Sequence, residues 1–341
     1  MGLKLLLKRG ALLAAANWPI VAIQFAARTT FQLLLAVPIV GAAVLVSALV
    51  GADVANVLQG GIRDMFTTIA DALTSEPVAL GAFVAAFGIV LVGGSVFMFL
   101  VKGGTVSVLV AANDSVRPIE REPLTADLLR GAARFTLVRF ADGCGRLFSR
   151  YLALGVALIL VYVVSAGGYL ALVVFGVFQY RGATEGTFII GWTVVAAAAT
   201  GALVVWITAV NVVYLLVQIA MAAEDAGLME GVRAVSRFMR VEFRDLGAIF
   251  LVVLAIVIAA TFASALVWSG VALIAFVPLV GLVVMPLQLF ALLVRGVLFE
   301  YIGLAALGAY VTLYRRYALV AKDRAGRETM RRSAGTLNAW G

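Results

Sequence analysis

The 341-residue sequence contains no histidine, a single cysteine and little charge. The absence of histidine excludes His general bases, catalytic triads that contain His, and His ligands for a metal. Because Cys144 is the only cysteine, an intrachain disulfide is excluded as well. Asp, Glu, Lys and Arg make up 13% of the chain, whereas soluble domains contain about 25%. A water-soluble core needs a polar shell, so this low charge argues against a soluble globular protein.

Apolar side chains, in contrast, are in excess. Hydrophobic residues make up 64% of the chain and the mean hydropathy is +1.09, whereas soluble domains are about 45–50% apolar. In lipid every backbone N–H and C=O must be paired internally, so a spanning segment is a helix or part of a closed barrel. Barrel strands have about 10 residues of alternating polarity, and the apolar runs here are longer and do not alternate. The sequence therefore predicts an all-α, polytopic transmembrane helix bundle.

Six apolar runs are long enough to cross a bilayer, which takes about 20 residues. They are residues 29–50, 78–101, 151–178, 188–222, 246–275 and 282–314. We expect one integral membrane domain over residues 1–341. In it, residues 1–28 form an N-terminal interfacial helix, 29–314 the six-span bundle and 315–341 a basic cytoplasmic tail.

The 26 Lys and Arg residues are distributed unevenly among the connections. Four precede residue 29, eight lie between residues 102 and 150, four lie between 223 and 245, and seven follow residue 314. The remaining connections contain only Arg63 and Arg181. Because Lys and Arg favour the cytoplasmic side, we expect a multi-pass protein of the bacterial cytoplasmic (inner) membrane with both termini in the cytoplasm.

Two segments outside the spans have the pattern of surface helices. In residues 1–28, Lys4, Lys8 and Arg9 precede a short apolar run that ends at Asn-Trp-Pro, residues 17–19. This pattern favours an interfacial amphipathic helix, with Trp18 at headgroup level, over a cleaved signal peptide. The connection 51–77 has apolar residues at helical spacing and predicts a helix on the outer surface.

Two of the basic connections resemble each other. Arg134-Phe135 precedes the third span, and Arg237-Phe238 precedes the fifth span 103 residues later. Each unit predicts a cytoplasmic interfacial amphipathic helix, the first over residues 124–138, followed by an outgoing span. Since both units enter the membrane in the same sense, the internal repeat is parallel, unlike the inverted repeats of many secondary transporters.

The arginines of these connections recur at helical spacing. In the second connection they form one basic face, and Leu228, Val232, Val235 and Met239 form an apolar face. Such a helix lies in the membrane interface with its arginines at the lipid phosphates. The predicted contacts with anionic headgroups are Arg130, Arg134, Arg233, Arg237, Arg240 and Arg244.

Two stretches carry a resemblance to a known family. Residues 223–237 read AEDAGLMEGVRAVSR and lead into a span, and residues 310–317, at the end of the last span, read YVTLYRRY. On these stretches the sequence resembles the bacterial six-span family of YciC-like proteins and of the membrane domain attached to some glycerophosphodiester phosphodiesterases. The resemblance covers mainly residues 205–317 and only the membrane module, because the metal-binding motifs of the phosphodiesterase domain are missing. It implies an accessory, transport-like or lipid-related role and no established activity.

Catalytic signatures are missing from the sequence. It contains no G-x-S-x-G elbow, no P-loop and no cluster of residues with metal-ligand spacing. Gly143-Cys144-Gly145 lacks the third glycine of a dinucleotide-binding turn. We therefore expect a protein that is not an enzyme and has no cofactor.

The strongest candidate for a site is a pair of charges in the sixth span. Arg295 and Glu300 lie within the apolar run, where each charge costs about 2.5–3.5 kcal/mol. They are five positions apart, so they do not face each other on one helix. The candidate polar partners are Asn211, Gln218 and Gln288. These residues form either a polar path inside the bundle or an interhelical structural lock.

These observations support two functional hypotheses. The first is a non-catalytic membrane module, either an accessory subunit or a lipid-organising protein. Its expected partners are membrane lipids with anionic headgroups, and either the subunits of a membrane-protein complex or further copies of the same chain. Nucleic acid is not an expected partner. The alternative is a transporter of small molecules or lipids that uses the polar site near Arg295 and Glu300. A water-filled cavity that reaches Arg295 would favour the alternative.

Overall fold

The computed structural model describes residues 2–50, 77–116, 118–180, 186–275 and 280–337. Over these ranges the chain is helical apart from short connections, and no β-strand occurs in them. Six helices are long and apolar enough to cross a membrane. They are α2 (Trp18–Val50), α5 (Pro77–Ser115), α7 (Leu137–Tyr180), α8 (Gly186–Glu224), α9 (Leu228–Ala275) and α10 (Val280–Leu337). The chain is therefore a multi-pass membrane protein, and the predicted all-α, six-span fold is confirmed.

The spanning helices extend beyond the predicted spans at the ends where the basic residues lie. α7 begins at Leu137 although the apolar run begins at residue 151, and α10 continues to Leu337 although the run ends at 314. The predicted boundary at residue 314 is thus not a structural boundary, because the helix runs through it without a break. The side chains become more polar after residue 314, but the helical hydrogen bonding of the backbone continues to Leu337.

Most of the apolar surface of the spans faces outward. Ile89, Val164 and Leu266 are each more than 70% exposed. Contiguous exposed apolar surface of this extent is unfavourable in water and is the normal condition of a helix that faces lipid tails. The spans are therefore solvated by hydrocarbon rather than by the protein.

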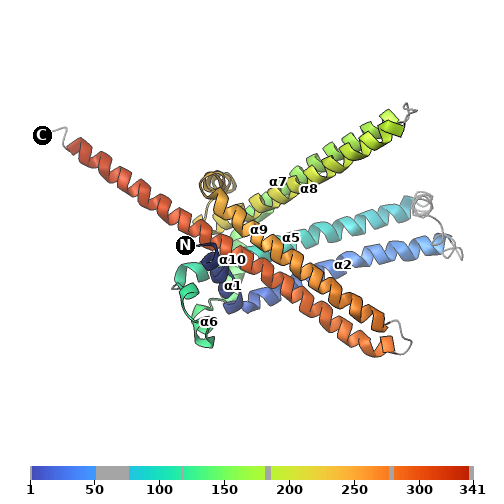
Figure 1. The fold of residues 1–341 in the computed structure, drawn as a ribbon, viewed down its shortest axis with the longest axis horizontal. Helices are drawn as coiled ribbons and strands as arrows, with labels where there is room; N and C mark the ends of the chain where they lie inside the picture. The colour runs from blue at the N-terminus through green and yellow to red at the C-terminus, as the bar shows by residue number, and fades with distance from the viewer. Residues whose placement is uncertain (1, 51–76, 117, 181–185, 276–279, 338–341) are drawn as a thin grey trace. The chain divides into compact units, whose positions relative to one another are not determined.

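The described helices divide into two compact units, Met1–Val21 with Gly103–Gly341, and Ala22–Lys102. In the larger unit, α7 and α8 form one helical hairpin, and α9 and α10 form another (Figure 1). In the smaller unit, Gly94 of α5 lies against the ring of Phe31 of α2, so that any side chain at position 94 would overlap the ring. The predicted outer-surface helix over 51–77 lies outside the described residues.

The N-terminal helix α1 (Leu3–Ala16) belongs to the protein core. Leu6, Leu13 and Ala14 are at most 1% exposed. The apolar side chains of α1 therefore pack against protein, whereas the interfacial helix predicted over 1–28 would turn them toward lipid. Sequence pattern alone does not separate these cases, since both need an apolar helix face.

Glycines permit the close approach of α1 to α10. A Cβ atom at Gly10 would lie 2.5 Å from the backbone nitrogen of Ala309 and would overlap the carbonyl oxygen of Ala305. A Cβ at Gly308 would lie 3.0 Å from the Cα of Gly10. The two backbones thus touch at a point where only glycine fits.

The first basic connection is not one continuous helix, in contrast to the prediction over 124–138. A 3₁₀ turn, η2 (Ile119–Arg121), is followed by α6 (Ala126–Ala132), which ends before Ala133, and α7 starts at Leu137. The side-chain oxygen of the buried Asn17 accepts hydrogen bonds from the backbone N–H groups of Arg134 (2.8 Å) and Phe135 (2.9 Å). Since an α-helix would use these N–H groups itself, the bonds to Asn17 stabilise the break.

The second basic connection is helical and forms the first part of α9. The helix bends at Glu242, where φ is −107° and ψ is 23°. Phe238 is fully buried, and its ring centroid lies 5.3 Å from those of Tyr314 and Tyr317. Within the predicted apolar face, Val232 is 40% exposed, as a side chain that faces lipid would be, whereas Val235 is buried in the protein.

We predict that Gly10→Val destabilises the protein by about 1–3 kcal/mol, the usual cost of forcing a larger side chain into a packed site. The matched control is Gly303→Ala in α10, where a Cβ would have no heavy atom within 4 Å. Thermal unfolding in detergent micelles measures both variants. Equal unfolding temperatures for Gly10→Val and the wild type would contradict the close contact of α1 with α10.

Candidate functional site

The residues predicted to form an intramembrane polar site lie on two helices, Asn211 and Gln218 on α8 and the other three on α10. Arg295 is exposed, and its guanidinium carbon lies 5.8 Å from the centroid of the Phe299 ring, at cation–π distance. Glu300 is buried and Gln288 is partly buried.

On α8 the two predicted residues serve the packing with α7. Asn211 accepts a hydrogen bond from the hydroxyl of Tyr162 (2.7 Å). Gln218 is fully buried, and its backbone oxygen accepts a hydrogen bond from the hydroxyl of Tyr151 (2.8 Å). The side-chain amide of Gln218 has no hydrogen-bond partner among the described residues. A buried amide without a partner costs about 1–3 kcal/mol, so it is a local weak point of the α7–α8 contact.

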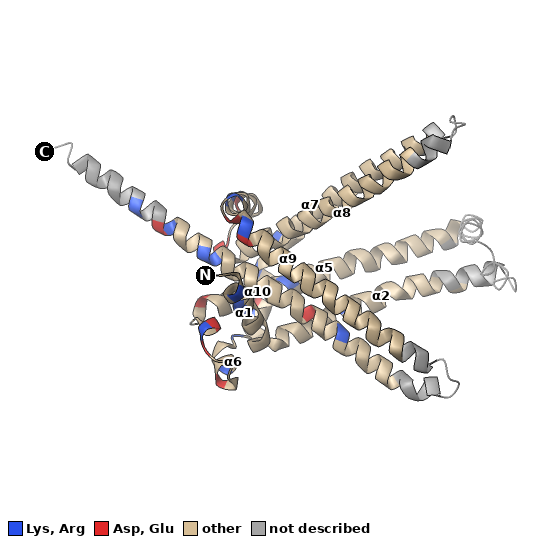
Figure 2. Cartoon of the chain, in the orientation of Figure 1, with Lys and Arg blue, Asp and Glu red and all other residues tan. Residues whose placement is uncertain are grey.

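The structure instead brings together a polar cluster that the sequence did not reveal. Figure 2 shows Lys, Arg, Asp and Glu gathered around α1, the beginning of α9 and the middle of α10. The cluster lies in the larger unit and unites residues far apart in the sequence. Its members are Arg9, Asn113, Asp114, Glu120, Glu224, Glu242, Asp245, Thr312, Tyr314, Arg315 and Arg316.

Arg9 is the centre of the buried part of this cluster. Its guanidinium donates to Glu120 (2.8 Å) and to the side-chain oxygen of Asn113 (3.0 Å). It also donates to the backbone oxygens of Asn113 (3.0 Å) and Val116 (3.1 Å). The Arg9 and Glu120 side chains are only 10% and 5% exposed. The hydroxyl of Thr312 donates to the same oxygen of Asn113 (3.1 Å), which connects α10 to α1 and α5.

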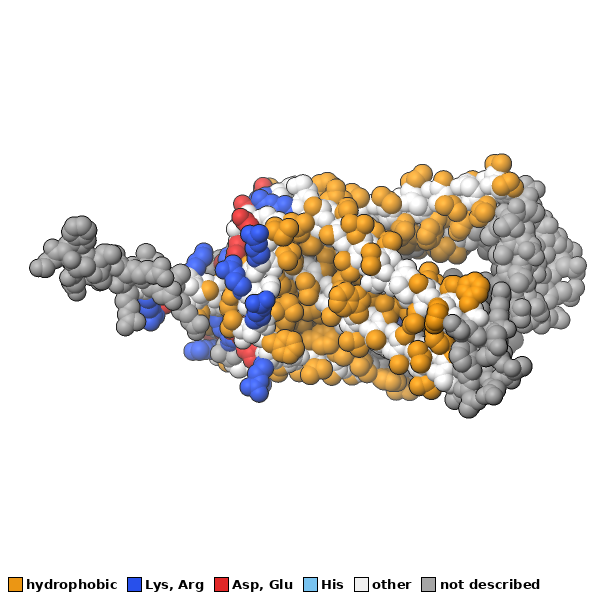
Figure 3. Space-filling model, turned by 90° about the horizontal axis from the view of Figure 1, so that it is seen from above, with side chains coloured by type: hydrophobic (Ala, Val, Ile, Leu, Met, Phe, Trp, Pro, Cys, Tyr) orange, Lys and Arg blue, Asp and Glu red, His pale blue; other side chains and the backbone are white. Residues whose placement is uncertain are grey.

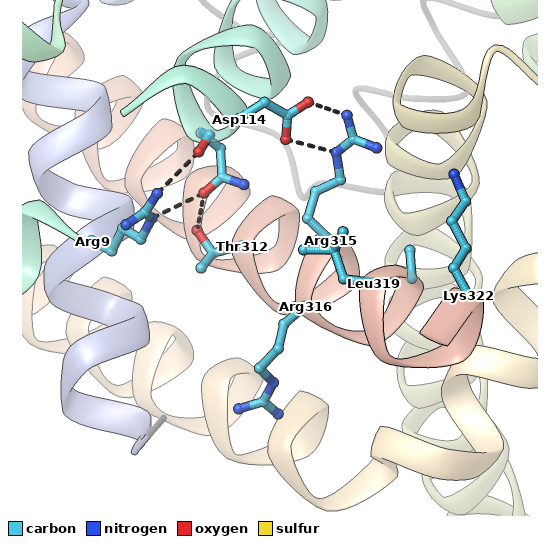
Figure 4. A pocket seen from close by; sticks show the side chains of 9 residues that line it. Arg9, Asp114, Thr312, Arg315, Arg316, Leu319 and Lys322 are labelled. Atoms are coloured by element: carbon cyan, nitrogen blue, oxygen red, sulfur yellow. Dashed lines mark hydrogen bonds and ion pairs between the residues drawn. The ribbon is translucent and has the colours of Figure 1, made fainter. Parts of the chain in front are cut away.

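Arg315 and Arg316 are adjacent in α10 but point in opposite directions (Figure 4). Arg315 forms a bidentate pair with Asp114 at the end of α5 and donates to the backbone oxygen of Ala223 (3.0 Å). Arg316 donates to Glu242 (3.1 Å) and Asp245 (3.0 Å) in α9. The two arginines thus join α10 to α5, α8 and α9.

Two further polar contacts fasten the end of α8. The hydroxyl of Tyr314 donates to Glu224 (2.7 Å), the last residue of that helix. Arg150 of α7 donates to Asp225 (2.7 Å), whose φ of 53° is in the left-handed region. Asp225 thus holds a strained turn between α8 and α9 through a charge-assisted bond.

A cleft of about 440 Å³ opens beside the cluster (Figure 4). Its lining combines Arg9, Asn113, Asp114 and Thr312 with Arg315, Arg316, Ala318, Leu319 and Lys322. Most of these polar groups are engaged with one another. The cleft therefore lies at the outer edge of this network of paired charges.

The predicted headgroup contacts lie on the surface of the same end. Arg233, Arg237, Arg240 and Arg244 are exposed on α9, and none of the four forms an ion pair among the described residues. Arg130 pairs with Asp127 (3.3 Å) in an exposed position. Arg134 is partly buried and donates to Ser115 (2.8 Å). On the face in Figure 3, charged side chains form a band beside an extensive apolar surface.

Sequence reasoning missed the buried cluster because it treated Arg9 and Arg315 only as positive charges on the cytoplasmic side. A signal was present: Asn113-Asp114 and Glu224-Asp225 each follow an Ala-Ala pair at the end of an apolar run. Runs that end on the same side of a bilayer place their terminal polar residues at one depth, where they can pair.

Comparison with known proteins adds no assignment: no family model, curated protein or solved structure matches the chain. Within the described ranges, no group of three His, Cys, Asp or Glu side chains is placed to hold a metal ion.

We predict that Arg9→Leu destabilises the protein by about 3–5 kcal/mol, because it leaves the buried Glu120 carboxylate without its partner. The control is Arg130→Gln, which removes a pair whose side chains are 81% and 91% exposed and is expected to cost at most about 1 kcal/mol. Unfolding in detergent, followed by circular dichroism, compares the two. Similar midpoints for both variants would show that the buried pair does not stabilise the fold.

Proposed function

We propose that this chain is a non-catalytic module of the bacterial cytoplasmic membrane that acts at the anionic lipid surface, as a lipid-organising or accessory protein. The observation that carries this proposal is the exposed face of Arg233, Arg237, Arg240 and Arg244 on α9. It lies immediately before the lipid-facing part of the helix. A cationic face at the edge of a bilayer attracts anionic headgroups by about 1 kcal/mol per charge.

The state of the neighbouring carboxylates supports the proposal. Glu242 and Asp245 are bound by Arg316, and Asp225 is bound by Arg150 and Arg146. Asp225 therefore has two cationic partners, whereas Glu242 and Asp245 share one guanidinium. The four exposed arginines outnumber the one carboxylate charge left over by this sharing, so a net positive charge remains for a negative partner.

The absence of catalytic activity is part of the proposal. Its support is that these polar groups serve one another: the buried Arg9 is bound to Glu120 and Asn113, and the partly exposed Arg315 to Asp114. The transporter alternative requires the candidate polar residues to face a common cavity. Neither the cleft described above nor a second groove, beside α9, is lined by Arg295, Glu300 or their candidate partners.

We expect the arginine face to lie in the cytoplasm. Since Cys144 is the only cysteine, Cys144→Ala supplies a background in which Arg233→Cys introduces one exposed thiol. A membrane-impermeant maleimide should label this thiol only after cells are permeabilised. Labelling of intact cells would invert the proposed topology.

We also expect the four-fold variant Arg233→Gln, Arg237→Gln, Arg240→Gln, Arg244→Gln to fold but to lose its preference for anionic lipid. The measurement is the ratio of phosphatidylglycerol to phosphatidylcholine that remains bound after mild detergent extraction from mixed vesicles, determined by mass spectrometry. Wild type should be enriched in phosphatidylglycerol and the variant should match the vesicle composition. Unchanged enrichment would refute the lipid role, and a stoichiometric protein partner recovered from native membranes would identify an accessory subunit instead.

A further inference from the structure

A groove between α8 and α9 combines an apolar floor with one of the four arginines. Its volume is about 570 Å³, within the range of about 300–1,000 Å³ that is usual for ligand sites. Its lining consists of Val213 on α8 and of Val232, Val235, Ser236, Met239, Arg240 and Phe243 on α9. Five of these seven side chains are apolar, and Ser236 and Arg240 supply a hydroxyl and a guanidinium.

The groove lies where the polar end of the protein meets the lipid-facing surface. Val213 belongs to the apolar run of α8, and Arg240 and Phe243 stand on either side of the bend at Glu242. Phe243 and Val241 are 67% and 62% exposed. An elongated ligand in the groove can thus contact hydrocarbon-like surface with one part and a cation with the other.

The positive charge of Arg240 favours an anionic ligand. Arg240 is exposed and forms no ion pair among the described residues. The carboxylates closest in sequence, Glu242 and Asp245, are bound by Arg316 at 3.1 and 3.0 Å. A guanidinium that forms no ion pair favours a phosphate, to which it can donate two parallel hydrogen bonds.

We propose that this groove is a binding site for one anionic phospholipid, with an acyl chain along Val213, Val232 and Met239 and the phosphate at Arg240. The proposal rests on the lipid role proposed above and makes it specific. It assigns to Arg240 a role that Arg233, which does not line the groove, lacks. The other three arginines then contribute only diffuse attraction.

The test compares single variants of these two exposed arginines in the full-length chain. Wild type, Arg240→Gln and Arg233→Gln are reconstituted in vesicles of phosphatidylcholine with phosphatidylglycerol. The lipid retained per chain after detergent extraction is then counted by native mass spectrometry. Arg240→Gln should lower phosphatidylglycerol retention about tenfold, the effect of losing a hydrogen bond to a charged group. Arg233→Gln should change retention less than about twofold, because it removes only screened surface attraction.

A second pair of variants tests the apolar part of the groove. Ser236→Trp fills the groove from an exposed position, and Ser236→Ala leaves it open. Ser236→Trp should abolish the retained phosphatidylglycerol, whereas Ser236→Ala should keep most of it. Unchanged unfolding temperatures of the four single variants show that the differences arise from binding.

The outcomes separate the specific site from the general lipid role. If Arg240→Gln and Arg233→Gln have equal effects while the four-fold variant loses its enrichment, the groove proposal fails and the surface role stands. If the four-fold variant also keeps its enrichment, both fail. Equal retention of phosphatidylcholine by wild type, or a protein segment cross-linked in the groove, would overturn the proposed ligand.

Discussion

The buried Arg9 guanidinium is the interaction on which the larger unit depends. It satisfies Glu120 and Asn113 at once, and Thr312 donates to the same Asn113 oxygen. Helices α1, α5 and α10 thereby converge on a few atoms. In a low-dielectric environment such a network is stable only while every member is paired, since an unpaired buried charge costs several kcal/mol. The network therefore fixes which helix ends meet, while apolar contact supplies most of the packing around them.

Different parts of the same helices pack against protein and face lipid. The fully buried side chains Phe238 and Tyr314 lie at the polar cluster, whereas side chains such as Val164 and Leu266 are largely exposed along the spans. Lipid tails are as apolar as these side chains, so the spans gain little from burying them against each other. The specificity of the fold then has to come from the end of the bundle that is not in hydrocarbon.

The sequence predicts those features that depend on residues close together in the chain. The length of an apolar run fixes whether a segment can span the bilayer, so all six spans could be predicted. Prediction from the sequence fails where a contact joins distant residues: Arg9 is 111 positions from Glu120, and Arg315 is 201 positions from Asp114. The break before α7 belongs to the same class, because its cause is the distant Asn17. Helical spacing alone predicted that the α9 arginines are exposed. It did not predict that Arg240 lines a groove together with Val213 of α8.

The unbroken course of α10 has an electrostatic consequence for the end of the chain. From Arg316 to Leu337 the helix continues for 21 residues, a rod of about 32 Å at 1.5 Å per residue. The Debye length in physiological salt is only about 8 Å. The exposed ion pair of Arg327 with Asp323 belongs to this rod, and Arg327 is about 16 Å along it from Arg316. This distance is twice the Debye length, so the pair is electrostatically independent of the polar cluster.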